Sequence, residues 1–97
     1  MNIVLFNDNI LVNELQDDLV ANGTVVRYDS DSPYMFSEVL VVSNEANEKG
    51  INVGDVVVIK RYAKEEYLPG YYFVSYKDIR GTLPMSTYEE MKAEEVI

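Results

Sequence analysis

The run Val56-Val57-Val58-Ile59 constrains the fold of this chain more than any other segment, because four consecutive β-branched residues strongly favour a strand. It follows a Gly54-Asp55 corner, which marks the start of the strand. Other short apolar or aromatic runs are bounded by Asn, Asp, Gly and Pro, and we expect strands in residues 3–6, 10–12, 37–42, 56–59, 71–76 and 79–83, with a strand edge in residues 15–20. Seven or so short strands without alternating helices predict a small all-β barrel or sandwich.

Polar segments separate these strands. Residues 43–50 predict an exposed excursion, and Pro69-Gly70 suits the central positions of a type II turn. From Pro84 the composition changes, and Ser86 with Glu89 three residues later forms a capping-box pattern. Residues 84–97 therefore predict a short C-terminal helix or a frayed tail. One stripe of that helix would hold Tyr88, Met91 and Glu95.

The chain has 97 residues, enough for one small domain, and it contains neither cysteine nor histidine. Without cysteine there is no disulfide framework, thiolate metal site or thiol nucleophile. Without histidine the commonest general base and metal ligand are both missing. Carboxylates could still hold Ca²⁺ or Mg²⁺, but the spaced ladder of an EF-hand is absent. We therefore expect a protein that is not an enzyme and has no cofactor or metal.

The formal net charge of −9 limits the partners of the chain. An acidic surface repels nucleic-acid phosphate and anionic lipid, so neither is expected as a partner. The apolar residues 3–6 are too few for a signal peptide, and no apolar run approaches the roughly 18 residues of a membrane span. These observations predict a soluble, cytoplasmic protein.

Residues 16–35 have the pattern of a long surface loop with an apolar tip. Asn22-Gly23 supplies the positive φ angles of a two-residue hairpin turn, and the apolar triplet Thr24-Val25-Val26 follows it. Residues 29–33 contain almost nothing to bury, so they cannot offset their own ordering entropy. The loop would thus carry a β-prone peptide. On periodicity alone, an ordinary edge strand over residues 24–28 is the alternative.

The order of these segments resembles the co-chaperonin family, the 10-kDa chaperonin lids of the GroES type. Residues 7–12 (NDNILV) resemble the opening "x-D-R-hydrophobic-hydrophobic-V" of that family, and residues 37–42 (SEVLVV) resemble its "G-E-V-L-A-V" strand. Residues 53–58 (VGDVVV) are similar to the "V-G-D-x-V-hydrophobic" corner, with Tyr62 soon after it. Residues 72–79 (YFVSYKDI) are similar to the closing strand ahead of "D-I-L-A", and Gly23 to Val26 lie where the family has its mobile-loop tip. The match runs in order from about residue 3 to residue 83.

The chain departs from the family pattern in three places. The excursion between Val42 and Val53 is about half as long as the usual roof hairpin, so the top of the dome would be open or differently closed. Thr24 replaces a bulkier aliphatic residue at the loop tip, which should weaken that contact. Residues 84–97 extend beyond the usual end. Short, divergent lids of this kind are encoded by bacteriophages, so the resemblance implies that this protein is of viral origin.

The resemblance implies a GroES-like irregular β-barrel in a single domain, residues 1–97, with a mobile loop at about 16–35, a shortened roof loop at about 43–52 and a C-terminal extension at 84–97. It implies a lid that caps a GroEL-type chaperonin and encloses client proteins, while ATP is bound by the chaperonin and not by this chain. The residues that would contact the chaperonin are Gly23, Thr24, Val25 and Val26. The competing class is an acidic β-barrel binding or structural module, an inhibitor or phage particle component, with no chaperonin partner.

A homo-oligomeric, heptameric ring is also implied by the resemblance. The apolar β segments at the two ends of the domain would have exposed edges that need cover. Pairing the first strand of one subunit with the last strand of its neighbour would cover them. The predicted interface residues are Ile3, Val4, Leu5, Phe6, Ile79 and Leu83.

The remaining charged and aromatic clusters have simpler interpretations. Lys60-Arg61 with Lys64 predicts a solvated face, and the adjacent acids Asp17-Asp18 and Glu89-Glu90 predict solubilising charges, because nothing holds them across a substrate. Three tyrosines of the aromatic strand are expected in the core and at subunit contacts rather than in a ligand-stacking surface: Tyr71, Tyr72 and Tyr76.

Overall fold

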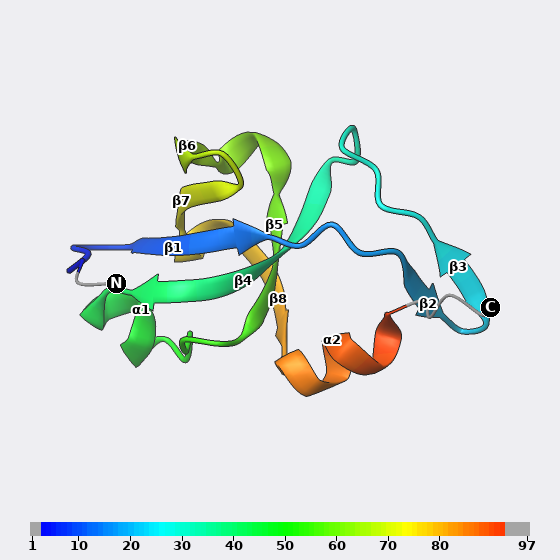
Figure 1. Cartoon of the computed structure of the whole chain (residues 1–97). Helices are drawn as coiled ribbons and strands as arrows, with labels where there is room; N and C mark the ends of the chain where they lie inside the picture. The colour runs from blue at the N-terminus through cyan, green and yellow to red at the C-terminus, as the bar shows by residue number, and fades with distance from the viewer. Residues whose placement is uncertain (1–2, 93–97) are drawn as a thin grey trace.

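The computed structural model describes residues 3–92 and has an elongated shape, with extents of 44 × 24 × 23 Å. A sheet forms the body of the molecule, and a two-stranded hairpin projects from one end of it (Figure 1). A short C-terminal helix lies between the two. Within residues 3–92 no helix is long and apolar enough to cross a membrane.

The body is one antiparallel sheet with the strand order β6-β7-β1-β4-β5-β8. Its strands are β1 (Asn9–Glu14), β4 (Tyr34–Val42), β5 (Val56–Lys60), β6 (Glu65–Leu68), β7 (Tyr71–Ser75) and β8 (Ile79–Leu83). The hairpin consists of β2 (Leu19–Ala21) and β3 (Thr24–Val26). The predicted all-β fold is confirmed. The sheet does not close into a barrel, because the end strands β6 and β8 are not paired with each other in the described residues.

The three central strands are formed where the sequence is richest in aliphatic residues. β4 alternates strictly at its start, so Met35, Ser37 and Val39 are buried while the residues between them are partly exposed. β5 holds the β-branched run, and Val56, Val57 and Ile59 are completely or almost completely buried. The Gly54-Asp55 corner extends this pairing, because Gly54 N–H donates to the Val39 carbonyl and Val39 N–H donates to the Asp55 carbonyl.

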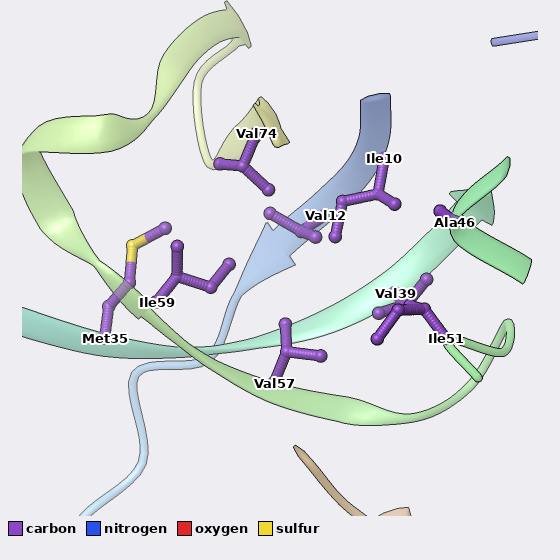
Figure 2. Packing of buried hydrophobic residues seen from close by; sticks show 9 residues of the cluster. All are labelled: Ile10, Val12, Met35, Val39, Ala46, Ile51, Val57, Ile59 and Val74. Atoms are coloured by element: carbon purple, nitrogen blue, oxygen red, sulfur yellow. The ribbon is translucent and has the colours of Figure 1, made fainter. Parts of the chain in front are cut away.

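The main core lies on the concave side of these strands (Figure 2). It is made almost entirely of aliphatic side chains contributed by β1, β4, β5, β7, α1 and the loop after α1. A second, smaller cluster lies against the C-terminal helix and contains Leu19, Val56 and Tyr88. The main cluster consists of Ile10, Val12, Met35, Val39, Ala46, Ile51, Val57, Ile59 and Val74.

The excursion expected at residues 43–50 is exposed at all but two positions, as predicted, but it contains a helical turn, α1 (Asn44–Glu48), that was not expected. The Ser43 hydroxyl accepts from Ala46 N–H as an N-cap, and it donates to the Asn7 carbonyl at 2.6 Å. Gly50, with a φ of 94°, ends the turn, and Ala46 is fully buried against the main core. The segment is therefore anchored to the body through Ser43 and Ala46.

Two further expectations about local structure are wrong. Residues 3–6 form no strand, since β1 begins only at Asn9. The polar residues after Lys64, in contrast, form strand β6, which pairs with the aromatic strand β7 through a turn at Pro69-Gly70. Gly70 has a φ of 84° there, as the predicted turn requires.

The C-terminal helix α2 (Met85–Met91) confirms the expected short helix but begins differently. Its N-cap is Pro84, without a side-chain hydrogen bond, so the capping box expected from Ser86 and Glu89 is not formed. Within the helix, Tyr88 is buried and Met91 is partly buried against the smaller cluster. Glu95, expected on the same stripe, lies outside the described residues.

Candidate functional site: the projecting arm and its root

The hairpin that projects from the body, residues 19–26, is called the arm below. Asn22 and Gly23 form its turn with φ angles of 52° and 77°, and two positive values are what a type I′ hairpin turn requires. The pairing Leu19↔Val26, Val20↔Val25 and Ala21↔Thr24 follows from this turn. The turn predicted from the Asn-Gly dipeptide is therefore present, and it places the four predicted contact residues at the far end of the molecule (Figure 1).

The arm exposes apolar side chains that the body does not use. Val20, Val25 and Val26 are 38%, 50% and 53% exposed, and all three residues of β3 are exposed. Val20 and Val25 are cross-strand partners, so their side chains share one face of the hairpin, whereas Val26 pairs with Leu19 on the other face and lines the pocket beside the body. Because β3 pairs with β2 and not with the main sheet, the triplet is not an edge strand of the body.

The chain that returns from the arm to the body is fastened by Arg61. Arg61 Nη1 lies 2.6 Å from Glu14 Oε2, and the Tyr28 hydroxyl donates to the same oxygen at 2.7 Å. The guanidinium also donates to the Ser32 carbonyl at 2.8 Å and to the Asp29 carbonyl at 3.2 Å. The Arg61 side chain thus joins the end of β1 to two positions of the return segment, residues 27–33.

This ion pair is shielded from water, with exposed fractions of 14% for the Arg61 side chain and 4% for that of Glu14. Burial alone would raise the pKa of Glu14. The hydrogen bonds from Arg61 and Tyr28, together with the charge of Arg61, outweigh that effect and hold the pKa below its usual value. Glu14 is therefore ionised at neutral pH and depends on Arg61 for its charge balance.

The two connections of the arm are also joined to each other. Tyr28 N–H donates to Asp18 Oδ1 at 2.7 Å, and Arg27 Nη1 lies 3.1 Å from Asp18 Oδ2. The Arg27 side chain is largely exposed, so its ion pair contributes little, whereas the backbone bond fixes the spacing of the two connections.

The outgoing connection, residues 15–18, is held by the C-terminal helix. The Tyr88 hydroxyl donates to Asp17 Oδ2 at 2.8 Å, and the Tyr88 ring lies 5.7 Å from that of Phe36 on β4. Leu19, the first residue of the arm, is buried between Val56 and Tyr88. The backbone of Leu19 also forms an antiparallel bridge with Lys92, at the end of α2.

A pocket of about 280 Å³ separates the arm from the body. Its walls are mixed, because apolar side chains from the arm root and β4 alternate with charged residues of both signs. The main lining residues are Leu15, Leu19, Val26, Met35, Phe36 and Arg61. Among residues 3–92, no group of three or more acidic side chains is placed to hold a metal ion.

The six predicted interface residues are not brought together within one chain. Val4 and Phe6 are exposed and, with Leu5, line a second pocket beside Glu65 and Phe73, at the β6–β7 end of the sheet. Strand β8 forms the opposite end of the sheet. On β8 the predicted residues face inward, with Ile79 against the main core and Leu83 against the smaller cluster.

Sequence reasoning missed the root of the arm. Arg61, interpreted as part of a solvated face, is a nearly buried link, and Asp17 and Asp18 accept structural hydrogen bonds instead of only solubilising the surface. One signal was present in the sequence. Glu14 continues the alternation of the buried residues Ile10 and Val12, so its carboxylate falls at a position expected to be buried, where it needs a partner of opposite charge. The sequence does not reveal that this partner lies 47 residues away.

A scan against protein-family models and a search of curated proteins found no match to this chain.

Proposed function

We propose that this protein is a cytoplasmic co-chaperonin lid, which caps a GroEL-type chaperonin ring through its arm while the chaperonin holds ATP. The observation that supports this most directly is the type I′ hairpin with exposed Val25 and Val26, projecting from a β-sheet body that has its own core. Such a tip fits an apolar groove on a partner and leaves the fold of the body independent of the contact. The chain itself needs no catalytic group for this role.

Energetics favour action by several arms together. The exposed valines are already about half buried, so completing the burial of each would contribute about 1 kcal/mol, and Thr24 less. Each residue of the arm that becomes ordered only on binding would oppose this by about 1–2 kcal/mol, which new hydrogen bonds offset only in part. One arm therefore binds weakly. A ring that presents several arms makes the later contacts intramolecular, which allows capping and still permits release.

The proposed heptameric ring uses the two ends of the sheet. Residues 3–6 leave apolar side chains exposed beyond β1, and the outer edge of β8 is unpaired within residues 3–92. Pairing residues 3–6 of one subunit with β8 of its neighbour would cover both features.

Deletion of residues 1–6 is expected to convert the ring into monomers, because it removes the segment that covers β8 of the neighbour. Light scattering coupled to size exclusion measures the mass, and circular dichroism serves as the control for folding. A ring of unchanged mass after the deletion would contradict this interface, and a full-length chain that is already monomeric would contradict the ring itself.

The proposed function predicts ATP-dependent association with a chaperonin. The protein is mixed with a purified GroEL-type chaperonin and separated by size exclusion, with ATP and without nucleotide. Co-elution with the chaperonin is expected only when nucleotide is present. Absence of co-elution in both samples would contradict the proposal and favour the alternative, an acidic β module without a chaperonin partner.

A further inference from the structure

In the described part of the chain, the contacts of helix α2 with the arm are centred on its root. Leu19 is 5% exposed and Tyr88 is 1% exposed, and the two pack together against Val56 of the body. Two further contacts hold the start of the arm: the Tyr88–Asp17 hydrogen bond, in the outgoing connection, and the backbone bridge between Leu19 and Lys92. Figure 1 shows α2 between the body and the arm.

The tip of the arm stays uncovered by this contact. Val20, Val25 and Val26 keep their exposure although Leu19, next to Val20 in the chain, is buried. A helix that blocked the arm would bury the valines, whereas α2 buries only the residue from which the hairpin starts. The arrangement therefore fixes the direction and register of the arm and leaves its contact surface free.

We propose that α2 is a brace that keeps the arm folded as a hairpin in the free protein, and that Tyr88 is its positioning residue through the bond to Asp17. An arm that is already folded loses less conformational entropy when it binds, so the brace strengthens every contact that the tip makes. The consequence for binding rests on the proposed function. The folding of the arm does not, since it is measured in the free protein.

The chemistry of the Tyr88 hydroxyl suits this role. Burial and the neighbouring Asp17 carboxylate both raise the pKa of Tyr88 far above its usual value. The hydroxyl therefore keeps its proton, and remains a donor to Asp17, throughout the physiological pH range.

Hydrogen exchange on the full-length protein tests the brace. Tyr88→Phe removes the hydroxyl but keeps the ring against Phe36, and the amides of residues 19–26 are expected to exchange about fivefold faster, the effect of losing one hydrogen bond. The amides of β1, β4 and β5 should keep their rates. Tyr62→Phe is the matched control, because the Tyr62 side chain is exposed on the body and should change neither region.

The proposal is overturned if Tyr88→Phe leaves the arm amides unchanged, or if it accelerates the body as much as the arm. A double-mutant cycle with Asp17→Ala adds a second criterion. If Tyr88 acts through Asp17, the double variant exchanges about as fast as Asp17→Ala alone. If the two effects on log rate simply add, Tyr88 acts by another route and the assigned role is wrong.

Capping assays then separate the brace from the function. If the wild type associates with a chaperonin in ATP, Tyr88→Phe is expected to require at least about fivefold more protein for half-maximal capping, and equal affinity would contradict the link to binding. If the wild type fails to associate, the proposed function fails, while the exchange result still decides whether α2 braces the arm.

Discussion

Replacing Val25 with aspartate is expected to abolish ATP-dependent association with the chaperonin and leave the fold unchanged. Half of the Val25 surface is exposed, and its strand β3 belongs to the arm alone, so the body loses no packing. In a complex, the new carboxylate would have to enter an apolar groove without a partner, which costs several kcal/mol for each arm. In the proposed ring, every subunit would carry that penalty. Size exclusion with the chaperonin and ATP measures the loss.

Val53→Asp is the matched control for this substitution. Val53 is 62% exposed and lies on the body, in the loop between α1 and β5, far from the arm. It receives the same change of charge and should still support capping. Unchanged circular dichroism and oligomer mass show that both variants fold. Normal capping by Val25→Asp would exclude the triplet as the contact, and loss of capping in both variants would indicate a general charge effect instead.

Replacing Arg61 with alanine is expected to lower the free energy of unfolding by about 3–5 kcal/mol, because a buried Glu14 carboxylate would be left without its counter-charge. The carbonyls of Ser32 and Asp29 would lose their donor at the same time. The return segment should then detach from the body. Urea unfolding at neutral pH, followed by tyrosine fluorescence or circular dichroism, measures the change.

Two controls separate the buried charge from other losses at this site. Lys60→Ala, at the adjacent position, should stay within about 0.5–1 kcal/mol of the wild type, since Lys60 forms no ion pair in the described residues. The double variant Glu14→Met with Arg61→Met removes both charges and fills a similar volume, so it should recover much of the stability lost in Arg61→Ala. A double variant no more stable than Arg61→Ala would show that the carbonyl contacts, which both variants lack, account for the loss rather than the buried charge.

The strands of the body could be predicted from sequence because their signals are local. The β-branched run of β5, the apolar run in β4 and, in the arm, the Asn22-Gly23 turn each predict structure from neighbouring residues alone. The short helix α1 was missed although Ser43 caps it, because five residues of weak periodicity give little helical pattern. Strand β6 was missed for a related reason, since its acidic residues carry no apolar alternation.

The root of the arm could not be predicted because its contacts join distant parts of the chain. Asp17 and Tyr88 are 71 residues apart, and Glu14 and Arg61 are 47 apart, so no spacing rule relates them. Taken singly, each of these residues is of a type that is common on protein surfaces. Only the packing of α2 against the arm, and the passage of the return segment across the end of β5, turns them into partners.

The arm and the body have separate strand ladders, with β2 paired to β3 in one and six strands in the other. Residues 20–25 can therefore be exchanged for another hairpin of equal length, provided that the turn keeps its two positive φ angles, without repairing any contact inside the body. If the arm is the contact proposed above, a graft of this kind would change which partner is recognised and preserve the scaffold. Partner choice could then diverge by changes in six consecutive residues, while the rest of the sequence would be constrained only by folding and assembly.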